Sequence, residues 1–83
     1  MTMIDVQHEP EKQRFVIYHE QGDCLLEYRL QGQSIDFTST YIPFRLRGQG
    51  LAEALVDAGL AWAQAQGFEQ QASCWYVAKR LAR

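Results

Sequence analysis

Cysteine is scarce in this sequence, which holds only Cys24 and Cys74 among its 83 residues. The two lack the short spacing of a metal site and are too few for a disulfide scaffold. Long apolar runs are missing as well. No stretch reaches the roughly 18 residues that a membrane helix needs, and the N-terminus lacks the apolar segment of a signal peptide. We therefore expect a cytoplasmic protein with no metal site and no membrane partner.

Neither sign of charge dominates the composition. Eight Lys and Arg residues stand against ten Asp and Glu residues, for a net charge of −2, whereas nucleic-acid-binding domains are usually basic. This length fits one domain over residues 1–83, and a hydrophobic content of 47% is that of a globular chain. We expect no nucleic-acid partner, and either a monomer or a weak homodimer that pairs a free sheet edge.

The first forty residues alternate between short β-type runs and turn residues. Leu26, Tyr28 and Leu30 alternate with Glu27 and Arg29, which is the period of a strand with one buried face. Strands are predicted over residues 4–8, 14–19, 24–30 and 34–42. Because the turns between them are short, the strands should form an antiparallel meander.

After Gly50 the apolar period changes to that of a helix, which begins at Leu51 and ends at Gly67. A fifth strand over residues 68–73 and a short helix over residues 75–81 should follow. This order predicts an α+β fold (α/β three-layer). Since the helix connects strands four and five, a right-handed crossover makes these two strands parallel.

The loop before this helix, Arg45-Leu46-Arg47-Gly48-Gln49-Gly50, has the composition of an anion site. A helix start leaves four N–H groups without intrahelical partners, and no Ser, Thr, Asp or Asn stands between Pro43 and Leu51 to cap them. Glycines allow close approach of the backbone, while arginines and the helix dipole favour a phosphate. The alternative is an exposed turn whose glycines only satisfy the backbone and whose arginines keep it soluble.

These motifs resemble those of the GCN5-related N-acetyltransferases (the GNAT superfamily), and in particular its short single-domain members with a cysteine after the CoA-binding helix. The loop fits the superfamily pattern Gln/Arg-x-x-Gly-x-Gly/Ala at each fixed position. Ile42-Pro43 matches an upstream Val/Ile-Pro, and Leu55-Val56 matches a Leu-Val segment of the helix. The cysteine signature appears as Ala72-Ser73-Cys74-Trp75-Tyr76.

The resemblance implies a minimal GNAT-like fold in which the parallel strands four and five splay apart. It also implies that acetyl-CoA is the acyl donor and that an unidentified amine accepts the acetyl group. The residues implied in acetyl-CoA binding are Thr40, Tyr41 and Ile42 beside the pantetheine, and Arg45, Arg47, Gly48, Gln49, Gly50 and Leu51 around the diphosphate.

Two residues are candidates for catalysis. Cys74 stands just before the predicted terminal helix, where a thiol has a lowered pKa, so it could carry the acetyl group or lie beside the thioester. Tyr76 could protonate the departing thiolate. The alternatives are a small buried cysteine and a half-buried aromatic with a satisfied hydroxyl.

Two departures from the short family bear on function. Ser39-Thr40-Tyr41 stands where a His-Thr-Glu run is common, so the roles of that histidine and glutamate do not transfer. The chain ends at Arg83, where relatives continue with a His-Pro-rich tail, and we expect its contribution to be absent or replaced. A second reading is therefore a non-catalytic CoA-binding or protein-interaction module.

Overall fold

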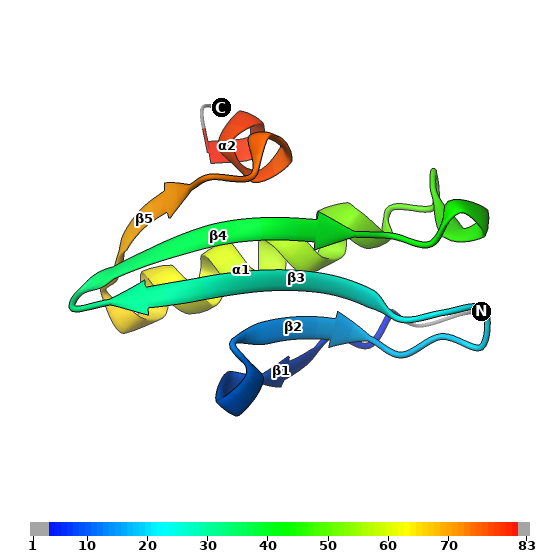
Figure 1. Ribbon diagram of the computed structural model, residues 1–83, viewed down its shortest axis with the longest axis horizontal. Helices are drawn as coiled ribbons and strands as arrows, with labels where there is room; N and C mark the ends of the chain where they lie inside the picture. The colour runs from blue at the N-terminus through cyan, green and yellow to red at the C-terminus, as the bar shows by residue number, and fades with distance from the viewer. Residues whose placement is uncertain (1–3, 82–83) are drawn as a thin grey trace.

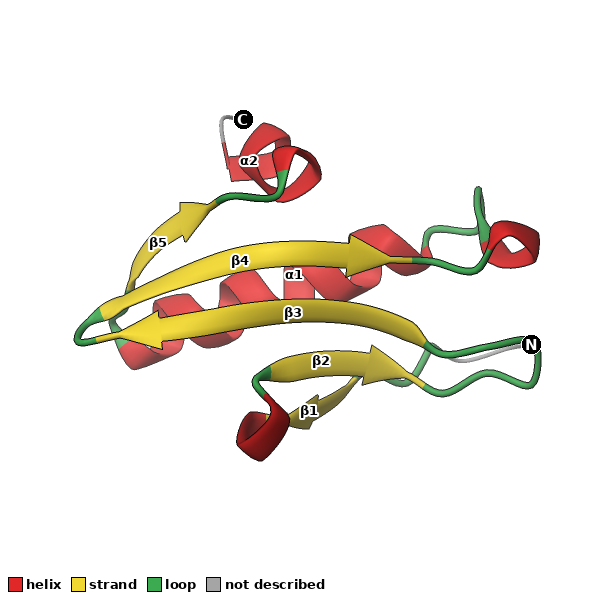
Figure 2. Cartoon of the chain, in the orientation of Figure 1, coloured by secondary structure: helices red, strands yellow, loops and turns green. Residues whose placement is uncertain are grey.

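The computed structural model describes residues 4–81, which form one mixed sheet with two helices (Figures 1 and 2). The strands are β1 (Gln7–Glu9), β2 (Arg14–Ile17), β3 (Cys24–Gln31), β4 (Ser34–Tyr41) and β5 (Glu69–Ala72), and they lie side by side in this order. The first four pair antiparallel, whereas β5 runs parallel to β4.

Helix α1 (Leu51–Gln66) connects β4 to β5 and lies along one face of the sheet, and α2 (Trp75–Leu81) follows β5. Short 3₁₀ turns, η1 (Pro10–Lys12) and η2 (Phe44–Leu46), punctuate the chain after β1 and after β4. The predicted α+β class and the parallel pairing of β4 with β5 are confirmed. No helix within residues 4–81 is both long and apolar enough to cross a membrane.

The predicted strands are all present, with shorter bounds at the N-terminal edge. β1 begins at Gln7 rather than at residue 4, because its partner β2 ends at Ile17 and Gln7 pairs with Val16. β2 stops before Tyr18 because the chain turns there, with Gly22 N–H donating to the carbonyl of His19. The 3₁₀ turn that begins at Pro10 separates β1 from β2.

The core lies between α1 and the sheet. Leu26 and Phe37 are fully buried on the central strands, and Leu55 and Val56 are fully buried on the helix. Gly59 faces both strands, and a Cβ atom there would lie 2.8 Å from Leu26 Cδ2 and 2.9 Å from Phe37 Cε1. The absent side chain therefore lets α1 approach the sheet closely.

Strands β4 and β5 diverge after a short paired segment. Their pairing ends where Phe37 meets Ala72, while β4 continues to Tyr41 (Figure 1). At the same level the register with β3 shifts, since Phe37 pairs with Tyr28 and Ser39 pairs with Glu27. The intervening Thr38 has no partner on β3 and forms a bulge, which increases local twist. The predicted splay of the two parallel strands is therefore present.

The C-terminal end of α1 is closed by its own backbone. Gly67 adopts φ 77°, and its N–H donates to the carbonyls of Ala63 and Gln64. Phe68 N–H also donates to the Ala63 carbonyl, at 3.0 Å. These bonds satisfy carbonyls that a helix end otherwise leaves free, and the conformation is one that glycine adopts without strain.

Candidate functional site

The N-terminal end of α1 is open. Gly50 occupies the N-cap position with φ 80° and ψ 10°, and no side chain accepts a hydrogen bond from the first turn. The first helical bond runs from Ala54 N–H to the Gly50 carbonyl, at 3.1 Å. Within residues 4–81, no acceptor is recorded for the amides of Leu51, Ala52 and Glu53. Such a helix end presents free donors and a partial positive charge to an anion.

The loop before this helix end is held by its own side chains. Arg47 Nε donates to the carbonyl of Ile42 at 3.1 Å, and its guanidinium lies 5.7 Å from the centre of the Phe44 ring. Gln49 Nε2 reaches the carbonyl of Arg45, at 3.5 Å. Gly48 adopts φ 82°, a conformation that favours glycine. Arg47 therefore shapes the loop as well as contributing its charge.

Two adjoining cavities lead from the loop to Cys74. The first, of about 230 Å³, is lined by Ile42, Leu46, Arg47, Gly48, Gly50, Leu51, Ala52, Glu53 and Tyr76. The second, of about 330 Å³, is lined by Thr40, Ile42, Arg47, Ala52, Cys74, Trp75 and Tyr76. Since they share Ile42, Arg47, Ala52 and Tyr76, we treat them as one groove, which we call the β4–α2 groove.

Cys74 lies at the point where β4 and β5 separate, immediately before α2. Its N–H donates to the Phe37 carbonyl at 3.0 Å, and its carbonyl accepts the first bond of the helix from Ala78 N–H. The sulfur lies 3.6 Å from Thr40 Oγ1, within hydrogen-bonding distance. The thiol is partly exposed and unoxidised, unlike the fully buried thiol of Cys24.

The surroundings of the two thiols shift their pKa values in opposite directions. Partial burial raises the pKa of Cys74, but hydrogen bonds from the Val77 amide, the Thr40 hydroxyl and the Tyr76 amide together outweigh it and leave the pKa below its ordinary value. Burial raises the pKa of Cys24, and the charge of Asp23 adds to this effect. Cys74 therefore has the greater thiolate character at neutral pH.

Tyr76, in the first turn of α2, lines both cavities of the groove. Burial raises its pKa, and the nearby Glu53 carboxylate raises it further, while Arg80 acts in the opposite sense. Arg80 itself forms an ion pair with Asp57, which ties α2 to α1. The Tyr76 hydroxyl is therefore held in its protonated form beside the groove.

The groove brings together most of the predicted site residues, from three separate segments of the chain. They are Thr40, Ile42, Arg47, Gly48, Gly50, Leu51, Cys74 and Tyr76. Arg45 and Tyr41 line neither cavity, and Tyr41 is 55% exposed on the strand position next to Thr40. Gln49 lines a different cavity.

The sequence prediction missed Ala52, Glu53 and Trp75 as lining residues. Ala52 and Glu53 follow Leu51 in the first helical turn, so the uncapped helix start itself could have indicated them. Trp75 is 74% exposed. An isolated tryptophan carries no signal in sequence that separates buried from exposed positions.

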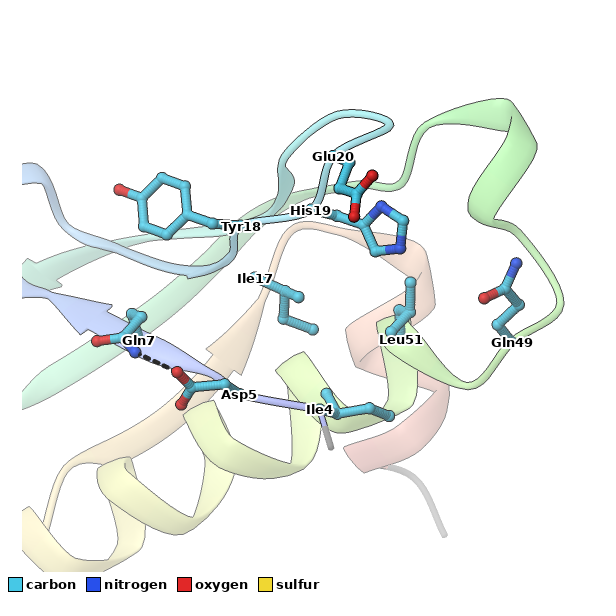
Figure 3. A pocket seen from close by; sticks show the side chains of 9 residues that line it. All are labelled: Ile4, Asp5, Gln7, Ile17, Tyr18, His19, Glu20, Gln49 and Leu51. Carbon is cyan, nitrogen blue, oxygen red and sulfur yellow. Dashed lines mark hydrogen bonds between the residues drawn. The ribbon is translucent and has the colours of Figure 1, made fainter. Parts of the chain in front are cut away.

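The cavity that Gln49 lines lies on the other side of the loop and has a volume of about 440 Å³ (Figure 3). Asp5 and Glu20 supply carboxylates, and no Lys or Arg from the described part of the chain lines it. Asp5 Oδ2 accepts a bond from Gln7 Nε2, and His19 Nδ1 accepts one from Gln21 N–H. It shares Leu51 with the β4–α2 groove, but none of Thr40, Cys74 and Tyr76 borders it.

Comparison with known proteins identifies a family for this chain. Residues 14–83 match the model of a family described as GCN5-related N-acetyl-transferase. The chain is 28% identical over 80 residues to "Protein NATD1" of Gallus gallus, a match that covers 92% of this chain and 72% of that protein. "Protein NATD1" of Xenopus tropicalis is 26% identical over 82 residues, covering 94% and 74%, and that of Homo sapiens is 28% identical over 80 residues, covering 92% and 70%.

The family match covers far more than half of the chain and includes the loop, α1, β5 and α2. The resemblance drawn from the loop and cysteine motifs is confirmed. This chain belongs to the GCN5-related N-acetyltransferase family.

Proposed function

We propose that the chain binds acetyl-CoA in the β4–α2 groove and transfers the acetyl group to an amine. The observation that carries this proposal is the continuity of the groove, which has the uncapped start of α1 at one end and Cys74 at the other. One ligand that combines an anionic diphosphate with a reactive thioester would occupy both ends. Membership of an acetyltransferase family supports the same ligand.

The diphosphate would bind at the helix start. The amides of Leu51, Ala52 and Glu53 are free in the first turn, and at Gly48 and Gly50 nothing lies within 4 Å of where a Cβ would stand, so phosphate oxygens can approach the backbone there. Arg47 lines both cavities and adds positive charge. Hydrogen bonds of this charged kind are worth about 1.5–3 kcal/mol each.

The pantetheine arm would lie in the gap between the diverging strands. β4 loses its partner on this side beyond Phe37, so its backbone near Thr40 is free to pair with the amides of the arm, and Ile42 lines the same cavity. This arrangement extends the sheet by a strand-like segment. It directs the thioester toward Cys74, where the two strands separate.

The first chemical step would transfer the acetyl group to Cys74. The thiolate attacks the thioester carbonyl, a carbon–sulfur bond to Cys74 forms, and the bond to the CoA sulfur breaks. The departing CoA thiolate takes the proton of the Tyr76 hydroxyl. An amine then attacks the acetyl-cysteine, the bond to Cys74 breaks and restores the thiolate, and the Tyr76 phenolate takes the proton that the amine loses.

Intact-mass analysis after incubation with acetyl-CoA tests this route. We expect one added acetyl group on the unmodified chain and on Cys24→Ala, and none on Cys74→Ala, since Cys24 is fully buried and has a raised pKa. Addition of amines should then remove the label with release of an acetylated amine. A Cys74→Ala chain that transfers acetyl groups at the original rate would contradict the covalent step and favour direct attack by the amine.

Calorimetric titration with desulfo-CoA, which cannot transfer an acetyl group, tests the binding step by itself. Binding of this analogue without acetyl-protein or turnover would instead favour a non-catalytic CoA-binding module. Failure to bind acetyl-CoA at millimolar concentration would contradict the whole proposal. Neither measurement depends on knowing the natural acceptor.

A further inference from the structure

The turn that carries Cys74 is tied to β4 by contacts on both sides of the cysteine backbone. Strand pairing between β4 and β5 ends at Phe37 and Ala72, so it does not reach Ser73 or Cys74. The Cys74 N–H bond to the Phe37 carbonyl extends the attachment two residues beyond Ala72. Two β4 side chains, those of Asp36 and Thr40, supply the remaining contacts.

Asp36 binds the residue before the cysteine with both carboxylate oxygens. Ser73 N–H donates to Oδ1 and the Ser73 hydroxyl donates to Oδ2, each at 2.7 Å. Two short bonds to one carboxylate fix the position of Ser73 and the direction of the peptide that follows. Since Cys74 is the next residue, its Cβ direction depends on this contact.

Thr40 approaches the sulfur itself. Its side-chain oxygen lies 3.6 Å from Cys74 Sγ, and both residues line the same cavity. A hydroxyl that donates to sulfur stabilises the thiolate relative to the thiol. Arg47 and Tyr76 are the other ionisable side chains that line this cavity, from the loop and from α2.

We propose that Asp36 and Thr40 are positioning residues for Cys74, Asp36 by holding Ser73 and Thr40 by donating a hydrogen bond to the sulfur. This inference rests on the proposed role of Cys74 and goes beyond it, because it assigns the reactivity of the thiol to two β4 side chains. Asp36 belongs to none of the motifs found in the sequence. It acts through Ser73 without touching the groove.

The rate of alkylation of Cys74 by iodoacetamide, followed by mass spectrometry as a function of pH, tests the Thr40 contact. The midpoint of the profile reports the pKa of the thiol, and the limiting rate at high pH reports access to it. For Thr40→Val, which keeps the shape and removes the hydroxyl, we expect the midpoint to move upward. The rate at pH 7, relative to the limiting rate, should fall about threefold or more. Thr40→Ser should restore the original profile.

The same assay tests the Asp36 contact. Asp36→Ala removes both acceptors and should raise the midpoint. Asp36→Asn keeps an oxygen for Ser73 N–H and an amide that can donate to the hydroxyl, so it should stay close to the original profile. Ser73→Ala loses the hydrogen bond of the hydroxyl and keeps that of the N–H, so its midpoint should lie between those of the two Asp36 variants. Cys24 is the internal control, because a chain that merely unfolds exposes both thiols to alkylation.

An unchanged midpoint in folded Thr40→Val and in folded Asp36→Ala would overturn the proposal. So would a profile for Thr40→Ser that matches Thr40→Val. If Thr40→Val fails to fold, Thr40→Ala provides the same comparison, and Ser73→Ala replaces Asp36→Ala in the same way. The assay contains no acetyl-CoA, so its failure is distinguishable from failure of acetyl-CoA binding or of acetyl transfer.

Discussion

Both ends of α1 have a glycine in the left-handed region, but only the C-terminal end has backbone hydrogen bonds that satisfy its free groups. At the C-terminal end, Gly67 N–H and Phe68 N–H return to carbonyls of the last turn. At the N-terminal end, no side chain or backbone carbonyl of the described residues accepts a hydrogen bond from the first amides of the helix. The backbone of the chain caps the C-terminal end of α1, whereas the first amides at the N-terminal end stay without an acceptor among the described residues.

The side chains around the two ends follow the same division. Near the C-terminal half of α1, His8 stacks on Phe15 with ring centres 4.2 Å apart and meets Trp62 at 4.5 Å. His8 Nε2 and the Tyr28 hydroxyl form a 2.6 Å hydrogen bond, so the polar groups of this partly buried pair satisfy each other. The N-terminal end has the β4–α2 groove instead. The comparison teaches that the chain satisfies its own polar groups at one end of α1 and has free amides beside a groove at the other.

The largest expected effect is on the core that both ends share. Phe37 is fully buried beneath α1, and Phe37→Ala should lower the free energy of unfolding by about 3–5 kcal/mol. For a chain of 83 residues this is a large part of the whole stability. Chemical denaturation followed by circular dichroism measures it. A loss below 1 kcal/mol would show that the helix does not depend on this contact with the sheet.

A matched pair of glycine substitutions tests the division between the two ends. Gly50 (φ 80°) and Gly67 (φ 77°) both have open space where a Cβ would stand, so Gly50→Ala and Gly67→Ala introduce the same backbone strain. Each should cost about 1–2 kcal/mol of stability. Only Gly50→Ala should weaken acetyl-CoA binding, by about tenfold, because it disturbs the amides that face the diphosphate. Equal affinities of the two variants for acetyl-CoA in calorimetry would show that the two ends of α1 do not differ in binding.

The two arginines of the loop also test binding at the N-terminal end of α1, with a smaller expected effect. Arg47 lines the groove and bonds to the Ile42 carbonyl, whereas Arg45 lines neither cavity. We expect Arg47→Ala to weaken acetyl-CoA binding several-fold more than Arg45→Ala, in line with the loss of a charged hydrogen bond. Isothermal titration of both variants at one ionic strength measures the ratio. A larger loss in Arg45→Ala would mean that the diphosphate lies outside the groove.

The smallest predicted effect is a pH dependence at the closed end. Burial lowers the pKa of His8 below 6.5, with the charge of Glu11 opposing it in part. The unfolded chain therefore takes up the proton first, and stability should fall as pH drops from 6.5 through the lower, folded-state pKa. The pKa of Glu9 is also lowered, so its contribution to stability is lost only at more acidic pH, below 4.5.

Thermal unfolding between pH 7.5 and 5 should show this decline. His8→Phe keeps an aromatic ring in the stack and removes the titrating group, so its curve should be flatter in this range even if its stability is lower throughout. A slope that is the same in both chains would assign the decline to other residues.

Much of this architecture is readable from local sequence. The alternation in β3 and the change to helical period at Leu51 predicted the sheet and α1, and the missing cap between Pro43 and Leu51 predicted the open helix end. What escaped prediction depends on register. Asp36 meets Ser73 only because β4 and β5 pair in parallel and part at Phe37. Gln49 sits within the loop motif, yet its side chain lines the cavity on the opposite side (Figure 3).

The most direct test of the central claim is an amide NMR titration of the full chain with acetyl-CoA. The open end of α1 predicts the largest shifts for the backbone amides of Gly48 and residues 50–53, followed by those near Thr40 and Cys74. Gly67 and Phe68, at the closed end of the same helix, should stay unchanged. An absence of shifts in residues 48–53 at millimolar acetyl-CoA, or shifts confined to residues 17–20 of the other cavity, would contradict the claim.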